Sequence, residues 1–375
     1  MRIGIDARFF GPIGKGLGRY TQKLIEKLEK LDLVNEYLIF LKKENFEDYQ
    51  PQNPNFKKVL ADYTWYSISE QLAMPRLLRK HKLDLVHFPH FNVPLLYRKK
   101  FIVTIHDLIL IHFPTIKNTT LNPLYYWIKF IAYRLIINFA IGRSEKIIAV
   151  SEFTKKDIME NYENIPQEKI IVTYESCEDF CMLSPNKDVE ILKRYAIIKP
   201  YLIYVGNAYP HKNLERLVGA FSLLHEKHSD LSLVFVGKED YFYRRLKDLV
   251  VKKGIDDVVF VGYVPDYDLD TLFHNAKAFV FPSLYEGFGL PPLEAMAKGL
   301  PVICSDHPCT REILGESAYY FNGKIEAEIV KAIDLVLSDK DLQDKIREAG
   351  YRQIKKYSWK KMAQETIGVY KSVKV

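Results

Sequence analysis

The sequence predicts an α/β fold in two domains, each a parallel sheet with helices on both faces. Short runs rich in β-branched and aromatic residues alternate with longer stretches of helical period, which is typical of strands joined through helices. This alternation starts afresh near Tyr201, and 375 residues exceed the usual size of a single core. We expect a first domain over residues 1–184, completed by a C-terminal helix over 358–375, and a second domain over 185–357.

The expected strands are short apolar runs bounded by Gly, Pro or Asp. Those of the first domain are Arg2–Asp6, Tyr37–Leu41, Leu85–Phe88, Ile102–His106, Ile147–Val150 and Ile170–Thr173. Those of the second domain are Leu202–Val205, Leu233–Val236, Val258–Val261, Ala278–Phe281 and Val302–Cys304.

The composition is that of a globular protein, with 48% hydrophobic and 27% charged residues. The first residues enter a strand pattern directly, without a basic leader, an apolar stretch and a small-residue cleavage site, so we expect a cytoplasmic protein. The longest apolar stretch, residues 121–141, is interrupted by Lys129, Arg134 and Asn138, which argues against a membrane-spanning helix.

The net charge of +7 is unevenly distributed along the chain. Residues 76–143 hold eleven Lys and Arg side chains against two acids. These are either scattered solvated side chains or a surface suited to peripheral contact with an anionic membrane at the inner face. No nucleic-acid motif accompanies the charge, so no nucleic-acid partner is expected. The apolar side chains in this region that either insert partly or pack in the core are Tyr125, Tyr126, Trp127, Ile131 and Leu135.

The most informative segment is residues 281–295, with the sequence FPSLYEGFGLPPLEA. A strand enters a turn containing Gly287 and Gly289, and a helix follows. Glycine lets the backbone approach a ligand closely, and the free N–H groups of a helix start attract phosphate. Glu286 and Glu294 flank the turn, and carboxylates accept hydrogen bonds from sugar hydroxyls. The alternative is that Glu294 only complements the helix dipole and Glu286 is a solvated loop acid.

This segment resembles the E-x7-E signature of the retaining glycosyltransferases of family 4. That family has the GT-B fold, two Rossmann-like domains facing each other across a cleft. The resemblance covers essentially the whole chain, because it extends to VGNAYPHKN at 205–213, VSEFT at 150–154, TIHD at 104–107 and SW at 358–359.

The resemblance implies roles for the residues of this turn. Glu286 is expected to contact the hydroxyls of the donor sugar, and Glu294 to bind the ribose hydroxyls of the nucleotide. Lys212 is expected to stabilise the diphosphate as it leaves. The backbone amides expected to meet the sugar and diphosphate are those of Gly287, Phe288, Gly289 and Leu290.

Asn207 departs from the family pattern, which often has an arginine directly after the glycine of that strand. We keep Asn207 among the expected donor-binding residues, and a diphosphate cation is then expected from elsewhere. The candidates are Arg8, Lys15, Arg19 and His211.

Residues 11–20, GPIGKGLGRY, form a glycine-rich segment expected to lead into a helix near Tyr20. The spacing matches a dinucleotide fingerprint only loosely, and no acidic residue ends the following strand. A loop that closes over the donor diphosphate from the opposite domain fits better, with Gly16 and Arg19 as donor-binding residues. A turn that only caps a helix is the alternative.

His106 ends an expected strand, where a lone histidine is usually structural. The resemblance implies that it contacts the transferred sugar, so the expected catalytic residues are Glu286, Lys212 and His106. Ser151 and Thr154 match a helix N-cap and its first turn. The sequence holds no DxD flanked by strands, no HExxH and no His/Cys cluster, so we expect neither a metal nor a cofactor.

The resemblance implies a hexosyltransferase that retains anomeric configuration. The GN-x-x-PHKN segment is similar to that of mannosyltransferases of surface-polysaccharide assembly, which makes GDP-mannose the first expected donor and a glycan or lipid-linked glycan the acceptor. UDP-glucose and UDP-N-acetylglucosamine stay open as donors. The other classes left open are a GT-B nucleotide-sugar epimerase and a non-catalytic sugar-nucleotide sensor. A dehydrogenase is disfavoured because no catalytic His/Arg pair can be placed.

Overall fold

The computed structural model describes residues 1–11, 15–114, 123–181, 189–197 and 200–374. The chain forms two compact units. Unit 1 comprises Met1–Leu108, Leu121–Glu175 and Ser358–Val375, and unit 2 comprises Ile109–Thr120 and Ser176–Tyr357. The expected boundary at 184/185 lies outside the described residues, and the division falls earlier, after Glu175. The short segment 109–120 also differs from expectation, because rings of His112 and Phe113 pack on Tyr285 of unit 2.

Unit 1 is built on a seven-stranded parallel sheet in the order β3-β2-β1-β4-β5-β6-β7. Its strands are β1 (Arg2–Asp6), β2 (Glu36–Leu41), β3 (Phe56–Leu60), β4 (Leu85–Phe88), β5 (Phe101–Ile105), β6 (Lys146–Ala149) and β7 (Ile170–Val172). Its α-helices are α1 (Lys15–Leu31), α2 (Ile68–Lys80), α4 (Pro123–Arg143), α5 (Glu152–Asn161) and α15 (Trp359–Ser372). Two short 3₁₀ turns are η2 (Lys43–Asn45) and η4 (Gln167–Lys169).

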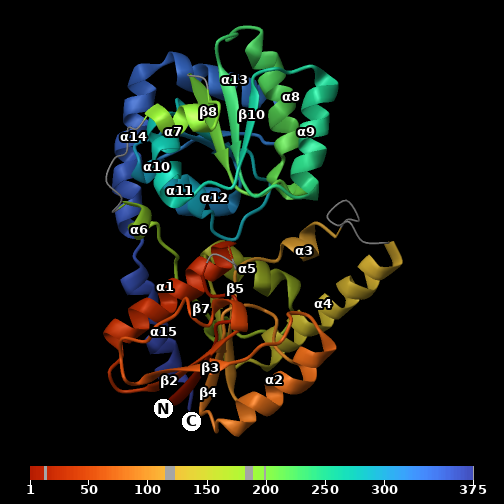
Figure 1. Cartoon of the computed structure of the whole chain (residues 1–375), viewed down its shortest axis with the longest axis vertical. Helices are drawn as coiled ribbons and strands as arrows, with labels where there is room; N and C mark the ends of the chain where they lie inside the picture. Colours follow the sequence, from red (N-terminus) through yellow and green to blue (C-terminus); the bar gives the residue numbers. More distant parts are fainter. Residues whose placement is uncertain (12–14, 115–122, 182–188, 198–199, 375) are drawn as a thin grey trace. The chain divides into compact units, whose positions relative to one another are not determined.

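Unit 2 is built on a six-stranded parallel sheet in the order β10-β9-β8-β11-β12-β13. Its strands are β8 (Tyr201–Val205), β9 (Ser232–Val236), β10 (Val258–Gly262), β11 (Ala278–Phe281), β12 (Val302–Ser305) and β13 (Tyr319–Phe321). Its longer helices are α8 (Leu214–His225), α9 (Tyr241–Lys253), α10 (Asp266–Asn275), α11 (Leu290–Ala297), α13 (Glu326–Ser338) and α14 (Lys340–Gln353). Its short elements are α3 (Ile109–His112), α6 (Glu178–Cys181), α7 (Val189–Arg194), η5 (Pro210–Lys212), α12 (Pro308–Leu314) and η6 (Ile354–Lys356). The predicted class, α/β with two parallel-sheet domains, is confirmed (Figure 1).

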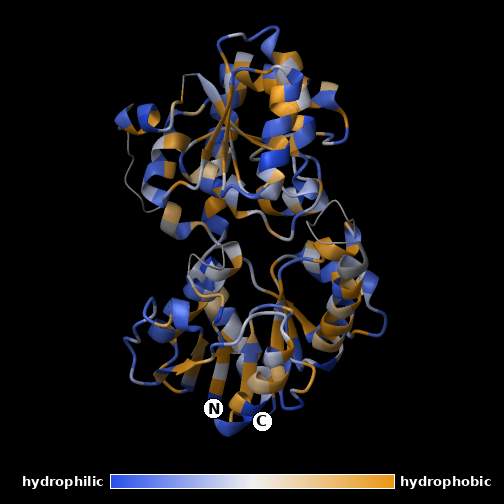
Figure 2. Cartoon of the chain, turned by 45° about the vertical axis from the view of Figure 1, so that its right-hand side comes forward, coloured by the Kyte–Doolittle hydropathy of each residue, from blue (hydrophilic) through white to orange (hydrophobic). Residues whose placement is uncertain are grey.

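The sequence pattern misses two strands, β3 and β13, and both lie at a sheet edge. An edge strand has one neighbour and is exposed along its other side, so it can be short or carry polar residues, although the edge strands β7 and β10 keep apolar runs and were predicted. In β3 this appears as Lys57 and Lys58 within FKKVL, and β13 has only three residues. Central strands have a neighbour on each side and helices over both faces, and β4, β5 and β11 are buried throughout. Figure 2 shows these central strands as hydrophobic, with hydrophilic residues on the outer helix faces.

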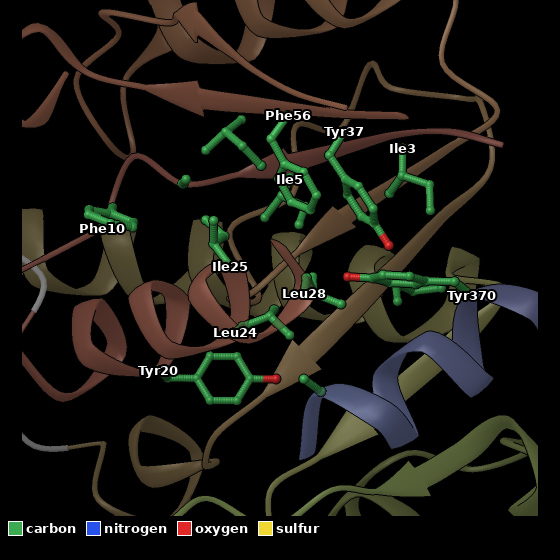
Figure 3. Packing of buried hydrophobic residues seen from close by; sticks show 14 of the residues in the cluster. Ile3, Ile5, Phe10, Tyr20, Leu24, Ile25, Leu28, Tyr37, Phe56 and Tyr370 are labelled. Carbon is green, nitrogen blue, oxygen red and sulfur yellow. The ribbon is translucent and has the colours of Figure 1, made fainter. Parts of the chain in front are cut away.

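The main core of unit 1 joins segments from both ends of the chain. Leu24, Ile25 and Leu28 of α1 point toward the sheet, and Tyr370 of α15 lies against Tyr37 of β2 (Figure 3). Tyr370 is fully buried, and its hydroxyl is 2.8 Å from Nδ1 of His87 on β4. The C-terminal helix is therefore an integral part of unit 1, because it covers an apolar face that α1 and the sheet would otherwise expose.

Helix α4 contains the apolar stretch noted in the sequence. Its residues on one side are buried, including Ile137, Ala140 and Ile141. Among the described residues, no helix combines the length and the hydropathy needed to span a bilayer.

Candidate functional site

The sheet of unit 2 reverses its strand order between β8 and β11. From β8 the sheet continues through β9 to β10, and from β11 through β12 to β13. Ligands of open parallel sheets bind outside the carboxyl ends of the strands at such a switch point. The loop after β8 carries Asn207 and Lys212, and the loop after β11 carries Glu286. The fold thus brings together site residues that lie far apart in the sequence.

Lys212 and Glu286 form an ion pair across this switch point. Lys212 Nζ lies 2.6 Å from Glu286 Oε1, and the two side chains are 13% and 9% exposed. The ammonium also lies 5.7 Å from the ring centroid of Phe281, which excludes water from one side. Coulombic attraction is stronger at such a site than in water. The pair therefore holds a cation, already oriented, beside a carboxylate at the place where a ligand is expected.

Asn213 fixes the two loops that carry this ion pair. Its side-chain amide donates to the carbonyl oxygens of Pro282, at 3.1 Å, and Gly323, at 2.7 Å. Its backbone has φ of +62°, a left-handed conformation that asparagine tolerates better than most residues. A backbone hydrogen bond from Leu284 to the carbonyl of His211, at 2.8 Å, adds a second link between the loops. The last residue of the PHKN segment is thus structural.

Replacing Asn213 with alanine is expected to destabilise unit 2 by about 2–3 kcal/mol, because two carbonyls lose a donor and alanine disfavours positive φ. Asn213→Gly is the matched control: it loses the same hydrogen bonds but accepts the backbone conformation, so its cost should be about 1 kcal/mol smaller. Urea denaturation followed by far-UV circular dichroism measures both. Equal destabilisation by the two variants would show that the backbone conformation contributes nothing.

The glycine turn after β11 leads into α11 as expected, with one difference. Gly289 is the N-cap residue, with φ of +94°, and the helix begins at Leu290. From the glycine turn and the helix after it we expected Glu294 in the first helical turn, but it lies in the second, and its side chain is 5% exposed. Gly287 and Phe288 are buried, whereas Gly289 and Leu290 are partly exposed. The accessible amides of this turn are thus at its helical end.

Asn207 lies in a tightly packed loop. Its carbonyl accepts a hydrogen bond from the Tyr204 hydroxyl at 2.8 Å, and its Oδ1 accepts one from the backbone N–H of Tyr209 at 3.3 Å. The neighbouring Gly237 approaches so closely that a Cβ there would lie 2.1 Å from the carbonyl oxygen of Gly206. Because the Asn207 side chain shapes the turn that leads to Lys212, it acts on the site through the backbone.

Two of the candidate diphosphate cations are excluded by their surroundings. Arg8 is fully buried and paired with Asp6 at 2.7 Å and with Glu70 at 2.5 Å. Burial, together with the positive charge of Lys212, lowers the pKa of His211 to about 3, so that its imidazole is neutral at physiological pH. The side chain of Lys15 lies outside the described part of the structure. Arg19 is partly exposed on α1 and remains a candidate.

The glycine-rich segment of unit 1 is helical earlier than expected. Helix α1 begins at Lys15 rather than near Tyr20, so Gly16 and Arg19 belong to its first turns. Residues 12–14 lie outside the described residues. Gly18 has a packing role, because a Cβ at this position would lie 2.0 Å from the carbonyl oxygen of Gly11. Gly16 is exposed, and a Cβ there would meet no atom within 4 Å, so packing does not require a glycine at this position.

His106 follows β5 and is held by two acceptors within unit 1. Its Nδ1 lies 3.0 Å from Oε1 of Glu175, and its Nε2 lies 3.0 Å from the carbonyl oxygen of Pro89. Burial lowers the pKa of His106, but the hydrogen bond and charge of Glu175, the Pro89 carbonyl and the charge of Asp107 outweigh burial and raise it overall. Both ring nitrogens donate within the protein when the ring is charged. Before His106 can contact the transferred sugar, one of its ring nitrogens must break its hydrogen bond with Glu175 or with the Pro89 carbonyl.

The stabilising contribution of His106 is expected to depend on pH. Because its folded-state pKa is raised, the contribution is complete below the unfolded pKa of about 6.5 and is lost as pH rises through the folded pKa. The free energy of unfolding lost in His106→Gln should therefore be largest in mild acid and shrink toward alkaline pH. Urea denaturation followed by tryptophan fluorescence measures this, because Trp65, Trp127 and Trp359 all lie in unit 1.

His87 provides a control with the opposite sign. Burial, with the charge of His106 nearby, lowers its pKa to about 3, so its contribution is present above pH of about 6.5 and is lost as pH falls. The stability lost in His87→Gln should therefore shrink in acid. Parallel pH profiles for the two variants would contradict a raised pKa for His106.

Sequence reasoning missed the contacts of Asn213 and Glu175. Asn213 follows Lys212 at the entry to α8, where an asparagine is a recognisable signal for a turn. Glu175 is 69 residues from His106, and no local pattern marks it. Ser151 is an N-cap as expected: it accepts from the Thr154 N–H at 3.0 Å. Within the described ranges, no group of three or more His, Cys, Asp or Glu side chains is arranged to hold a metal ion.

Comparisons with known proteins identify both halves of the chain. Residues 14–175 match the family described as Glycosyltransferase Family 4, and residues 192–353 match the one described as Glycosyl transferases group 1. O-antigen chain mannosyltransferase B of Escherichia coli is 29% identical, over 95% of this chain and 96% of its own. O-antigen chain mannosyltransferase RfbU of Salmonella typhimurium is 29% identical, over 86% of this chain and 87% of its own.

The fold also resembles solved structures. Sucrose-phosphate synthase from Thermosynechococcus elongatus matches with a TM-score of 0.79 and 18% identity, over 99% of this chain and 98% of that one. At this identity the likeness concerns the fold alone.

Proposed function

The chain belongs to the glycosyltransferases, with a family 4 domain followed by a group 1 domain, and on this basis we propose that it transfers mannose from GDP-mannose. The proposed acceptor is a glycan or lipid-linked glycan of a surface polysaccharide. The fold is GT-B, as the sequence predicts. The names of two relatives, both O-antigen chain mannosyltransferases aligned over most of the chain, support mannose as the sugar and a polysaccharide as the product.

The observation that carries the proposal is the Lys212–Glu286 pair at the switch point of unit 2. Lys212 is proposed to stabilise the negative charge that develops on the diphosphate when the glycosidic bond breaks. Glu286 then hydrogen-bonds the sugar hydroxyls, and buried Glu294 the ribose hydroxyls. The amides of Gly289 and Leu290 meet the sugar and diphosphate at the start of α11.

Transfer is proposed to occur with retention of configuration at the sugar. The bond between the anomeric carbon and the diphosphate oxygen breaks, and a bond to the acceptor oxygen forms on the same face. The acceptor hydroxyl gives its proton to the departing diphosphate, so the reaction needs no carboxylate as nucleophile. We also propose that no metal takes part, because Lys212 and the helix start supply positive charge.

The first test is a thermal-shift panel with GDP, UDP, ADP and their sugar conjugates, run once with EDTA present and once with Mg²⁺ in its place. A ligand at 100 times its dissociation constant stabilises by about 2.7 kcal/mol. We expect a shift with GDP and GDP-mannose that is lost in Lys212→Ala and Glu294→Ala. A shift with UDP-sugars instead would replace the donor, and a shift that needs divalent cations would overturn metal independence. Unchanged melting with every nucleotide would overturn the transferase proposal itself.

Helix α4 supports a peripheral contact with an anionic membrane as part of this function. Its apolar side chains Trp127, Ile128, Ile131 and Leu135 are 45–58% exposed, and the basic side chains of Lys129 and Arg134 are exposed beside them. An exposed apolar stripe flanked by basic residues is suited to the interface of anionic lipids. Tyr126, for which both insertion and core packing were left open, is buried at 7% exposure, and the side chain of Tyr125 lies outside the described residues.

Vesicle flotation tests this membrane contact. The protein should float with vesicles containing phosphatidylglycerol and not with phosphatidylcholine alone, and Ile131→Ser together with Leu135→Ser should abolish flotation. A matched control is Val251→Ser in unit 2, another exposed apolar residue, at 79% exposure. Equal flotation of all three proteins would overturn the contact.

A further inference from the structure

Unit 1 has a contiguous set of aromatic rings that the donor site does not use. Phe9 stacks on Trp65, with ring centroids 4.4 Å apart, and lies 5.2 Å from the ring of His90. His90 in turn lies 4.0 Å from Phe91, and Tyr66 lies 6.3 Å from His90 and 6.2 Å from Phe91. We call these five residues the aromatic surface of unit 1.

The aromatic surface lies where the topology of unit 1 predicts a ligand. The sheet reverses its strand order between β1 and β4. Phe9 follows β1, His90 and Phe91 follow β4, and Trp65 and Tyr66 follow β3. All five residues therefore stand at the carboxyl edge of the sheet, with the contact between Phe9 and His90 at the switch point itself.

Tyr66 is the exposed member of this surface, and its backbone is strained. Its side chain is 56% exposed, and its φ is +60°, a left-handed conformation that a large side chain rarely adopts. Such conformations persist only where the surroundings enforce them, and they concentrate at ligand sites. A residue that only filled space would be neither this exposed nor this strained.

A buried charge network enforces the conformation of Tyr66. Its backbone N–H donates to Oε2 of Glu70 at 2.7 Å. Glu70 is fully buried, accepts from Asn92 at 2.8 Å and pairs with Arg8, which in turn binds Asp6 through two hydrogen bonds. Replacing buried charges with apolar residues is often neutral or stabilising, so stability alone does not explain them. Here Glu70, a member of the network, holds the backbone of one exposed aromatic residue.

The rings of this surface suit an uncharged ligand. Burial, with the positive charges of His106 and Arg8, lowers the pKa of His90 to about 3, so its imidazole is neutral at physiological pH. A pyranose ring presents a flat face of C–H groups that packs against an aromatic ring, while its hydroxyls remain at the edge for hydrogen bonds. The five side chains supply no cation for a phosphate, and the ammonium of Lys42, 4.2 Å from the ring centroid of Trp65, is already paired with Glu44.

We infer that Tyr66 and the neighbouring rings of Phe91 and His90 bind the terminal pyranose of the acceptor glycan. The inference rests on the proposed function, since it names the residues that receive the acceptor in that reaction. Tyr66 supplies the stacking face, and Glu70 is a positioning residue that acts through the Tyr66 backbone.

Saturation-transfer difference NMR on the full chain, with methyl α-D-mannopyranoside as the probe, tests this inference. Tyr66→Gly removes the ring and relieves the positive φ, so it should fold at least as well as the native chain. We expect it to weaken probe binding about 10-fold, because the probe loses its apolar contact with one aromatic ring. Tyr66→Phe keeps the ring and should bind within about 3-fold of the native chain, because only the hydroxyl is lost.

One control separates this site from unit 2. Tyr267→Gly removes a tyrosine in unit 2 that is 63% exposed, and it should not alter the probe signal. A signal unchanged in Tyr66→Gly, or reduced equally in Tyr267→Gly, would overturn the inference. The nucleotide thermal shift of Tyr66→Gly should stay native. Failure of the proposed function would instead leave the native chain without a nucleotide shift, so the two failures can be distinguished.

Discussion

Replacing Lys212 with methionine is expected to lower kcat for sugar transfer by about 10²–10³-fold, the usual effect of removing one charge-stabilising group from a reaction centre. The ammonium already lies at the switch point, 2.6 Å from Glu286, so the positive charge is in place before the diphosphate becomes its partner. Methionine keeps most of the side-chain volume and removes only the charge. Transfer assayed at saturating donor and acceptor measures the change in kcat.

Lys227→Met is the matched control for this experiment. Lys227 also lies in unit 2 and also pairs with a carboxylate, Asp334, at 3.4 Å, but its side chain is 67% exposed. Exposed pairs contribute little, so kcat and stability should both stay near native. A Lys212→Met enzyme with native kcat and a raised KM for donor would show that Lys212 binds the ground state without acting on the leaving group.

Replacing Arg8 with methionine is expected to destabilise unit 1 by about 3–5 kcal/mol, because it leaves two carboxylates, Asp6 and Glu70, buried without their cation. Burial lowers the pKa of Arg8, but the two carboxylates outweigh burial and raise it above its ordinary value, so the guanidinium stays charged. The three tryptophans of the chain all lie in unit 1, and their fluorescence during urea denaturation reports this unit alone.

The exposed Arg311–Asp306 pair of unit 2 is the control for Arg8. Its distance of 2.8 Å is similar to that of the Arg8–Asp6 pair, but its side chains are 43% and 49% exposed. Arg311→Met should therefore cost about 0–1 kcal/mol, measured by urea denaturation followed by far-UV circular dichroism because the tryptophans do not report unit 2. A loss of similar size in both variants would mean that burial does not determine the cost of removing the charge.

The central strands of both sheets could be predicted because burial on two faces leaves a continuous apolar run. The edge strands β3 and β13 could not, since their exposed sides carry lysines in one case and their length is three residues in the other. The start of α1 was placed late for a related reason: Gly16 and Gly18 predict a loop, but close packing on the carbonyl oxygen of Gly11 keeps Gly18 inside a helix.

The residues of the donor site could be chosen from sequence, but their contacts could not. Glu286 and Lys212 were expected at one site through family resemblance, yet 74 residues separate them and no spacing rule predicts their ion pair. Arg8 shows the converse. Judged from the sequence, an arginine shortly after β1 is a reasonable phosphate ligand. Only the fold reveals that the carboxylate of Glu70, on α2, already neutralises the charge of this arginine.

The docking of α15 in unit 1 has a consequence for biosynthesis. All of Ser176–Tyr357 leaves the ribosome before Ser358–Val375, the segment that closes the core of unit 1 over Leu24 and Leu28. Domains generally fold as units during synthesis, so the half of the protein made first completes its folding last. Until then the apolar face of α1 lacks its cover, and a nascent chain in this state is a natural client for chaperones.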